Sequence, residues 1–362
     1  MTDAGPEPRA LVVGAGLAGC ECALQAASLG LLVDLAEQKP GRRSPAHHSD
    51  GLAELVCSNS FKSMQPSSAS GIQKEELFRM GSILLRVARE TAVPAGNALA
   101  VDRTLFSEQV THRIRTHPRI RLVEERISDL PDDRPVVIAT GPLTDGPLYD
   151  RIQELTDSPS LHFFDAAAPL VRADTIDRTL AYAASRYGKG GDDYLNCPMD
   201  RDTYDAFVRE LLSARLAPVQ GADEGTVFEG CMPVETMAAR GPETLRHGPM
   251  KPVGLPNPST GRIPHAVVQL RQDDRAASLY GLVGFQTRLA YPEQDRVFRM
   301  IPGLGRAVFE RYGVMHRNTY LAPDGLLDHD CQLRPDRMRI VRRYPLLFAG
   351  QITGVEGYVE SI

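Results

Sequence analysis

The sequence predicts an α/β fold in which a nucleotide-binding domain with a parallel sheet is interrupted by an inserted α+β domain. Three observations carry this prediction. An apolar run at residues 10–13 leads into a glycine-rich turn, and a second apolar run at 135–139 leads into a Thr-Gly turn. A third run with a glycine turn, at 346–351, lies close to the last residue. Strands followed by such turns at both ends of a chain are typical of one doubly wound sheet, with the middle of the chain inserted.

The first of these turns belongs to a complete Rossmann-like unit. A strand at 10–13 is followed by G-x-G-x-x-G, a helix at 20–29, a strand at 31–36 and an acidic residue. In such a unit the glycines permit a tight turn, close approach of a pyrophosphate and close helix–strand packing. The helix N-terminus attracts the phosphates and the acid binds ribose hydroxyls. The predicted cofactor-binding residues of this unit are Gly14, Ala15, Gly16, Leu17, Ala18, Gly19 and Glu37.

The position of this fingerprint, near the start of a long chain, favours FAD over NAD as the bound dinucleotide. The turn at 139–141 is common where the chain leaves the nucleotide domain of flavoproteins with two dinucleotide domains. We therefore predict the first part of an FAD-binding domain at 1–160, an insertion domain at 161–334 and the completion of the FAD-binding domain at 335–362.

The inserted segment carries its own secondary-structure signals. Apolar residues recur at helical spacing over 203–216, which predicts an amphipathic helix. The runs at 266–271 and 279–285 are separated by turn residues and predict neighbouring strands. Residues 236–265 are rich in Gly, Pro, Arg and His and predict a long loop.

Composition narrows the class of protein. The chain has 362 residues, 42% hydrophobic and 24% charged, with a formal net charge of −5. This length supports a sizeable core, and this composition excludes a disordered chain. The mild acidity argues against a protein that coats nucleic acid, but it leaves room for a local basic patch. No apolar run reaches the roughly 18 residues of a membrane helix, so we expect no membrane association.

The cysteines and the N-terminus predict a cytoplasmic protein. The six cysteines form no C-x-x-C pair, which argues against a disulfide framework and against a structural zinc site. We therefore expect no metal. The first eight residues lack the basic and apolar regions of a secretory signal.

Two cysteines stand in settings that suggest chemistry. Cys57 leads from apolar residues into a polar turn near the expected cofactor edge, where Lys62 could favour its thiolate form. Cys231 lies in a turn flanked by glycine and proline. From the residues alone, a structural role is the commoner one for either cysteine.

Ordered motifs along the chain resemble those of the bacterial folate- and FAD-dependent tRNA (uracil-5-)-methyltransferase family. The most specific are E-L-V-C-S-N-S at 54–60, Y-L-N-C-P at 194–198, F-E-G-C-M-P at 228–233, M-H-R-N at 315–318 and G-Q-I-T-G-V-E-G-Y at 350–358. The resemblance runs from about residue 9 to the last residue. The related flavoprotein family that modifies the wobble uridine lacks these cysteine motifs.

The resemblance implies methylation of C5 of the T-loop uridine in tRNA. Methylenetetrahydrofolate would give the carbon, and FADH2, reduced by NADPH or NADH, would give the electrons. A thiolate that adds to C6 makes C5 nucleophilic, and a base, for which a thiol is one candidate, must then remove the C5 proton. Cys231 is the implied nucleophile and Cys57 the flavin-side thiol, although these roles could be exchanged.

The same resemblance implies further ligand contacts. His316 would stack on the pterin of the folate, and Lys251 and Arg271 could hold phosphate or folate carboxylates. Solvated surface charges are the alternative for this last pair. Two basic clusters, at 112–121 and 334–343, could contact tRNA phosphates. The remaining residues implied near the cofactor are Ala139, Thr140, Gly141, Gly350, Gln351, Gly354 and Glu356.

Family members continue beyond the motif at 357–361 with a helix that would cover the sheet, so we expect a truncated C-terminal end and impaired activity. Two alternatives stay open: an RNA-binding or tRNA-folding remnant without catalysis, and a flavin oxidoreductase of a small molecule. The oligomeric state stays open as well.

Overall fold

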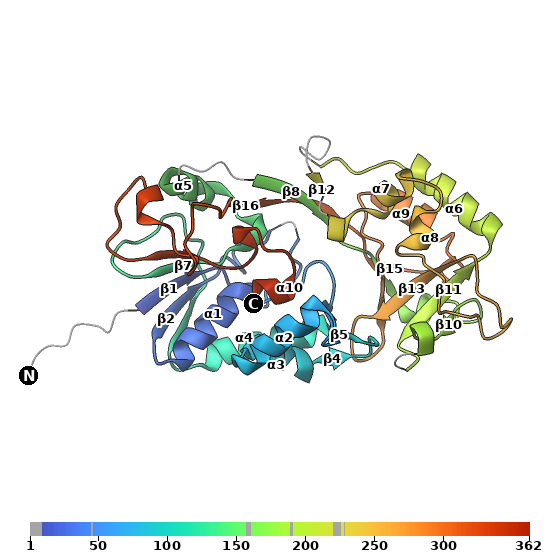
Figure 1. The fold of residues 1–362 in the computed structure, drawn as a ribbon, viewed down its shortest axis with the longest axis horizontal. Helices are drawn as coiled ribbons and strands as arrows, with labels where there is room; N and C mark the ends of the chain where they lie inside the picture. The colour runs from blue at the N-terminus through green and yellow to red at the C-terminus, as the bar shows by residue number, and fades with distance from the viewer. Residues whose placement is uncertain (1–8, 45, 157–160, 189–190, 220–225, 228) are drawn as a thin grey trace, which may run out of the picture.

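The computed structural model describes residues 9–44, 46–156, 161–188, 191–219, 226–227 and 229–362. Phe228, at the start of the motif around Cys231, and residue 160, at the first predicted domain boundary, lie outside the described residues. The molecule is elongated and has two lobes joined by long strands (Figure 1). The first lobe contains the chain's early elements together with its C-terminus.

A parallel five-stranded sheet forms the centre of the first lobe, in the order β17-β7-β1-β2-β6. The predicted parallel sheet is therefore confirmed, including its completion by a strand from the end of the chain. Its strands are β1 (Arg9–Val13), β2 (Leu32–Ala36), β6 (Ile120–Val123), β7 (Val136–Ile138) and β17 (Leu346–Phe348).

Both faces of this sheet are covered. Val12 packs with α1, α3 and α4 on one face, whereas its neighbours Leu11 and Val13 pack with α5 on the other. A small sheet of order β3-β5-β4 lies beside these helices. The other elements of the first lobe, on the two faces together, are α1 (Leu17–Ser28), α2 (Ala69–Arg79), α3 (Ile83–Glu90), α4 (Arg103–Thr116), α5 (Gly146–Thr156), α10 (Tyr358–Ser361), β3 (Ser60–Ser63), β4 (Ala92–Val93) and β5 (Ala98–Val101).

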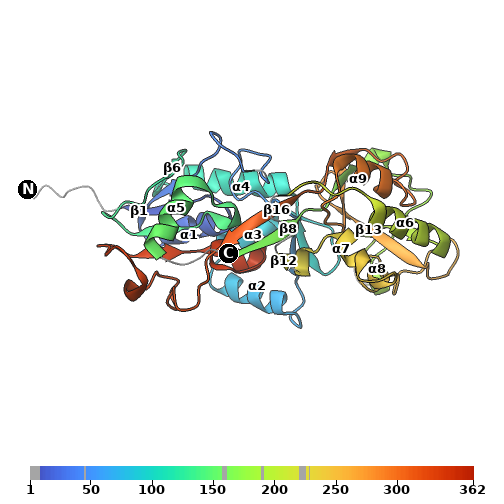
Figure 2. The same ribbon diagram turned by 90° about the horizontal axis from the view of Figure 1, so that it is seen from above.

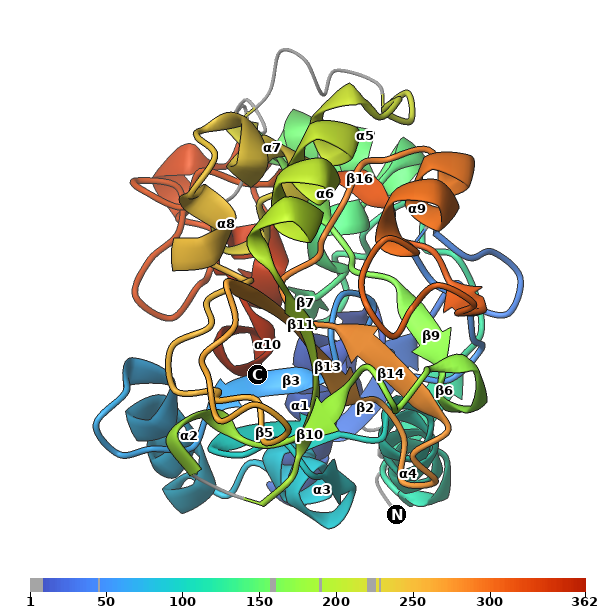
Figure 3. The same cartoon turned by 90° about the vertical axis from the view of Figure 1, so that its right-hand side faces the viewer.

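The second lobe is an antiparallel six-stranded sheet, in the order β10-β11-β13-β14-β9-β15, with helices α6–α9 on one side (Figure 3). The predicted helix and strand pair are confirmed as α6, β13 and β14, and Asp200 caps α6 by accepting from Thr203 N at 2.8 Å. The bounds are β9 (Leu170–Arg172), β10 (Tyr182–Ala183), β11 (Tyr194–Met199), β13 (Ala266–Gln272), β14 (Leu279–Leu282), β15 (Phe309–Arg311), α6 (Arg201–Ser213), α7 (Val234–Ala239), α8 (Thr244–His247) and α9 (Tyr291–Phe298).

The long loop predicted at 236–265 is wrong in part. Its first half contains the end of α7 and all of α8. These helices are too short to show a helical period in the sequence, and they form because Val234, Ala238 and Leu245 are buried in the core of the second lobe.

A three-stranded sheet of order β12-β8-β16 connects the lobes. Its long strands, β8 (Leu161–Ala166) and β16 (Met315–Tyr320), are antiparallel and run along the length of the molecule (Figure 2). The short strand β12 (Thr226–Val227) pairs in parallel with β8. None of the described helices has the length and apolar character needed to cross a membrane.

Candidate functional site

The three glycines of the β1–α1 turn have different surroundings. A Cβ on Gly14, whose φ is +97°, would lie 2.6 Å from Ala139 O, and a Cβ on Gly19 would lie 1.8 Å from Gly14 O. These two positions therefore exclude a side chain, because backbone occupies the space. A Cβ on Gly16 would meet nothing within 4 Å, so the protein leaves space at the middle glycine.

A cavity opens along the carboxyl edge of the first sheet. It is lined by the β1–α1 turn, by Glu37 and Lys39 after β2, and by the segment that follows β7. Gly16 precedes α1 as its N-cap and provides no side-chain cap, so N–H groups of the first turn are available to a phosphate. Glu37 accepts from Ala15 N at 2.9 Å and from Lys39 N at 3.0 Å, which fixes its carboxylate beside the turn. These residues fit a dinucleotide cofactor such as FAD.

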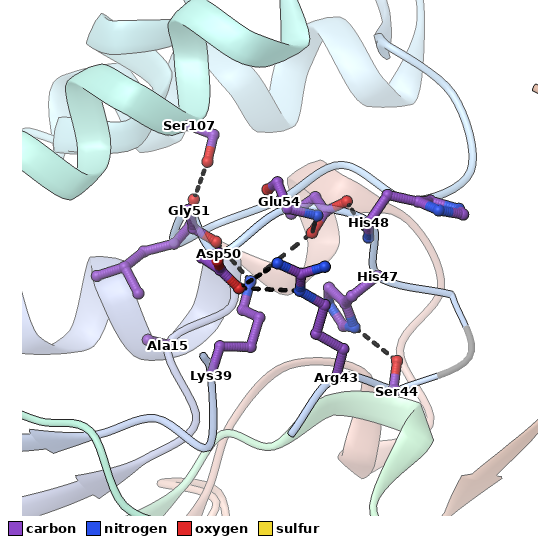
Figure 4. A network of polar contacts seen from close by, with 12 residues as sticks. Ala15, Lys39, Arg43, Ser44, His47, His48, Asp50, Gly51, Glu54 and Ser107 are labelled. Atoms are coloured by element: carbon purple, nitrogen blue, oxygen red, sulfur yellow. Dashed lines mark hydrogen bonds and ion pairs between the residues drawn. The ribbon is translucent and has the colours of Figure 1, made fainter. Parts of the chain in front are cut away.

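A polar network forms one wall of this cavity (Figure 4). The buried Lys39 donates to Gly51 O, and its Nζ lies 3.7 Å from Glu54 Oε2. Burial and the nearby Lys39 lower the pKa of His47, whose Nδ1 lies 2.6 Å from Ser44 Oγ. The network holds the segment that leads to Cys57 against the nucleotide-binding turn.

Cys57, Asp165 and Cys231 meet at the end of the cavity. One thiol or carboxylate atom from each lies within 4.8 Å of the corresponding atoms of the other two. The Cys57 Sγ donates to Ala166 O at 3.6 Å, and Cys57 N donates to Tyr358 Oη at 2.9 Å. The structure thus brings together two thiols that are far apart in the sequence.

Asp165 and His316 are directly paired on the bridging strands β8 and β16. Asp165 is 8% exposed, and burial raises the pKa of its carboxyl group, although the nearby Cys231 and His316 oppose this shift. Burial lowers the pKa of His316, and its Nδ1 has no hydrogen-bond partner among the described residues. Burial therefore favours the neutral form of the His316 ring, and the residue lines the cavity.

Most of the residues predicted from the sequence lie at this cavity. The contacts to FAD, folate and tRNA stay predictions. The cavity is lined by the predicted residues Gly14, Ala15, Gly16, Leu17, Ala18, Glu37, Cys57, Ala139, Thr140, Gly141, His316 and Gln351.

The other predicted residues of the last segment and of the turn lie beside this lining. A Cβ on Gly350 would be 2.6 Å from the side chain of Ala18, and one on Gly354 would be 2.9 Å from Tyr320. Burial and the nearby Asp165 raise the pKa of Glu356 to about 7, so this carboxyl group lies close to the thiol cluster.

The predicted basic residues lie elsewhere. Lys251 is exposed and outside the cavity, whereas Arg271 is half-buried and its Nε donates to Asn59 Oδ1 at 2.9 Å. Arg271 is thus held by a partner side chain, and the choice between its two interpretations stays a prediction. Lys62 forms an ion pair with Glu360 at 2.6 Å.

The expected basic clusters contain exposed arginines paired with acids. Arg115, for example, pairs with Glu124, and Arg334 pairs with Asp336.

Three residues of the site were not predicted from the sequence: Asp165, Tyr358 and Lys39. Asp165 gave a weak signal as an acidic residue that ends an apolar strand.

The fold and the cavity define a two-lobed dinucleotide-binding protein with a thiol site. Residues 9–362 match the family model described as GIDA, Glucose inhibited division protein A. The fold is similar to that of GidA from Aquifex aeolicus in its form II crystal, with a TM-score of 0.70 and 16% identity over 98% of this chain and 61% of that chain.

Closer relatives are named methylenetetrahydrofolate--tRNA-(uracil-5-)-methyltransferase TrmFO. The one from Rubrobacter xylanophilus is 57% identical over 354 residues, which are 98% of this chain and 78% of the relative. The one from Natranaerobius thermophilus is 54% identical over 98% of this chain and 80% of the relative. The chain belongs to this TrmFO family.

Proposed function

We propose that this chain methylates C5 of the T-loop uridine in tRNA, with methylenetetrahydrofolate as carbon donor, FAD as the bound cofactor and NADPH or NADH as reductant. The single observation that carries this proposal is the meeting of Cys57, Cys231 and Asp165 within 4.8 Å at one end of the dinucleotide cavity. Family membership and the fit of the cavity to a dinucleotide support it. A tRNA substrate would place the protein in the cytoplasm.

Cys231 and Cys57 would have different roles in the reaction. Uracil C5 is a poor nucleophile until a thiolate adds to C6, and we assign this addition to Cys231. Cys57, whose backbone N–H is held by Tyr358, would assist from the cofactor side and is a candidate base for the C5 proton. The geometry leaves the exchange of these two roles open, since both thiols lie within 4.8 Å of the same carboxylate.

The cofactor would be held by the first sheet. The turn at 14–19 and Glu37 would bind the pyrophosphate and ribose, and Thr140 and Gln351 would line the path toward the thiols. Bound FAD supplies the electrons that turn a methylene group into a methyl group. Residues 1–160 and 335–362 would together form the cofactor domain, and residues 161–334 would form the insertion domain.

The folate and the tRNA would enter from the side of the second lobe. His316 is the candidate for stacking on the pterin, because its ring lines the cavity beside Asp165. Lys251 could contact phosphate from its exposed position. Arg271 could act only through the contact between the lobes that it forms with Asn59.

The test is a labelling experiment with the purified chain, unmodified tRNA transcript, FAD, NADPH and methylenetetrahydrofolate labelled in the methylene carbon. Label in the T-loop uridine is expected. Cys231→Ala should abolish it, whereas Cys331→Ala, at an exposed cysteine, should not. NADPH-dependent flavin turnover without label would favour the small-molecule oxidoreductase, and tRNA binding without either would favour the RNA-binding remnant.

A further inference from the structure

We propose that Asp165 is the catalytic base that takes the proton of the Cys231 thiol while its sulfur adds to C6 of the uridine. This inference rests on the proposed function and assigns a further residue of the same site. It comes from the position of one buried carboxylate between two thiols.

The fold places Asp165 for this role. Asp165 is in β8, where it pairs with His316 of β16, and the residues on either side of it, Phe164 and Ala166, are 1% and 0% exposed. Its Oδ1 accepts from Ala166 N at 2.8 Å, which fixes the carboxylate plane and leaves the other oxygen for a further donor. A carboxylate oxygen of Asp165 lies within 4.8 Å of the Cys231 Sγ, and the two groups influence each other's pKa. The acceptor thus lies beside the thiol whose proton must leave.

Other groups near Cys231 are poorer acceptors. The His316 ring nitrogens do not belong to the group of atoms within 4.8 Å of one another. Cys57 also approaches Cys231, but it is a thiol that donates to Ala166 O, and a neutral thiol is a weaker proton acceptor than a carboxylate. Glu356 is close to Asp165, but it is not part of the cluster either. Among the described residues, Asp165 is therefore the carboxylate that belongs to one cluster with the reacting sulfur, within 4.8 Å of it.

Transfer of the proton to Asp165 costs less in this buried site than its release to water would. The facing Cys57, burial and the neighbouring Asp165 raise the pKa of the Cys231 thiol, so it stays protonated at rest. Burial also raises the pKa of Asp165, which makes its carboxylate a stronger base. A transfer between the two leaves one negative charge in the buried site before and after, which avoids the large cost of separating charges there.

The addition of Cys231 to the uridine moves one proton and two electron pairs. The S–H bond of Cys231 breaks and its proton goes to a carboxylate oxygen of Asp165. The sulfur electron pair forms the S–C6 bond, and the C5–C6 π pair moves into the enolate of C5, C4 and O4. After C5 has received its carbon, a second base removes the C5 proton, and the C5–H pair becomes the pair of a new enolate. This pair forms the C5=C6 double bond as the C6–S bond breaks, the sulfur leaves with the pair of that bond, and the thiolate recovers the proton from Asp165.

The experiment measures the S–C6 bond directly. A tRNA transcript that contains 5-fluorouridine has no C5 proton to lose, so the thiol adduct accumulates and migrates slowly on a denaturing gel. We expect Asp165→Asn to slow adduct formation by about 100-fold or more, in the range for loss of a general base. The tRNA dissociation constant and the melting temperature should stay unchanged. Asp165→Glu should restore part of the rate, and Asp150→Asn, at an exposed aspartate of α5, should match the wild type.

The pH profile separates a base from a structural residue. The wild-type adduct rate should fall at low pH as Asp165 becomes protonated, and this fall should vanish in Asp165→Asn. Wild-type adduct rates in Asp165→Asn, or an unchanged acid limb, would overturn the role of Asp165 and leave the proposed function intact. A wild-type chain that forms neither adduct nor labelled uridine would overturn both.

Discussion

Two alanine variants of the β1–α1 turn should have different effects. Gly16→Ala should weaken FAD binding, whereas Gly19→Ala should destabilise the fold. A Cβ on Gly19 would lie 1.8 Å from Gly14 O and 3.0 Å from Gly14 C, both backbone atoms. Touching carbon and oxygen atoms lie about 3.3–3.6 Å apart, so α1 and the turn would have to separate by roughly 1.5 Å. A Cβ on Gly16 would meet no protein atom within 4 Å, and its φ of −75° suits alanine.

The magnitudes follow from these surroundings. Overpacking costs about 1–3 kcal/mol, and Gly19→Ala should reach the upper end because no side chain can move away. At about 2–4 °C per kcal/mol, its melting temperature should fall by about 5–10 °C. Gly16→Ala should change the stability of the FAD-free protein by about 0.5 kcal/mol or less. Its methyl group would stand beside the free N–H groups of α1 and should weaken FAD binding about tenfold or more, which is 1.4 kcal/mol.

Two measurements on FAD-stripped protein decide this prediction. Circular dichroism melting gives the stability, and titration of flavin fluorescence gives the dissociation constant of FAD. A Gly16→Ala variant that binds FAD with wild-type affinity would refute the placement of the pyrophosphate at this turn. A Gly19→Ala variant that melts with the wild type would refute the close helix–strand contact.

Three further changes should have measurable effects. Lys39→Ala leaves the carboxylate of Glu54 without its buried partner and should cost about 3–5 kcal/mol in urea unfolding; a loss below 1 kcal/mol would contradict this. Asn59→Ala removes the acceptor of the half-buried Arg271 and should cost about 1.5–3 kcal/mol by the same measurement. The raised pKa of Glu356 means that the folded state binds this proton more tightly than the unfolded state. Stability should therefore fall as pH rises from about 4.5 to about 7, and Glu356→Gln should flatten this part of the profile.

The sequence predicted those parts of the fold that depend on residues close to one another in the chain. The β1–α1–β2 unit was predictable because the glycines, the apolar strands and Glu37 follow one another in a fixed order. The strand β17 was predictable because a buried parallel strand is a short apolar run with a turn behind it. The helix α6 showed its period within thirteen residues.

The contacts that build the thiol site could not be predicted because they join distant residues. Cys57 N donates to Tyr358, 301 residues away, and Lys62 pairs with Glu360 across 298 residues. The residues next to Cys57 and Lys62 in the sequence do not indicate these partners. The sequence therefore suggested that Lys62 would place its charge beside Cys57, whereas Lys62 forms its ion pair with Glu360 of the last helix. Asp165 was missed for the same reason. Its raised pKa and its place beside two thiols arise only in the folded protein.

The thiol site depends on how the two lobes are held. Cys57 belongs to the first lobe, Cys231 lies between β12 and α7, and Asp165 is on the strand that connects the lobes. Asn59 donates to Gln272 O and accepts from Arg271 on the second lobe, only two residues from Cys57. The contact between the lobes therefore also sets the distance between the two sulfur atoms. Asn59→Ala should thus slow adduct formation at Cys231 under conditions where the protein is fully folded, and an unchanged rate would show that the bridging strands alone fix the site.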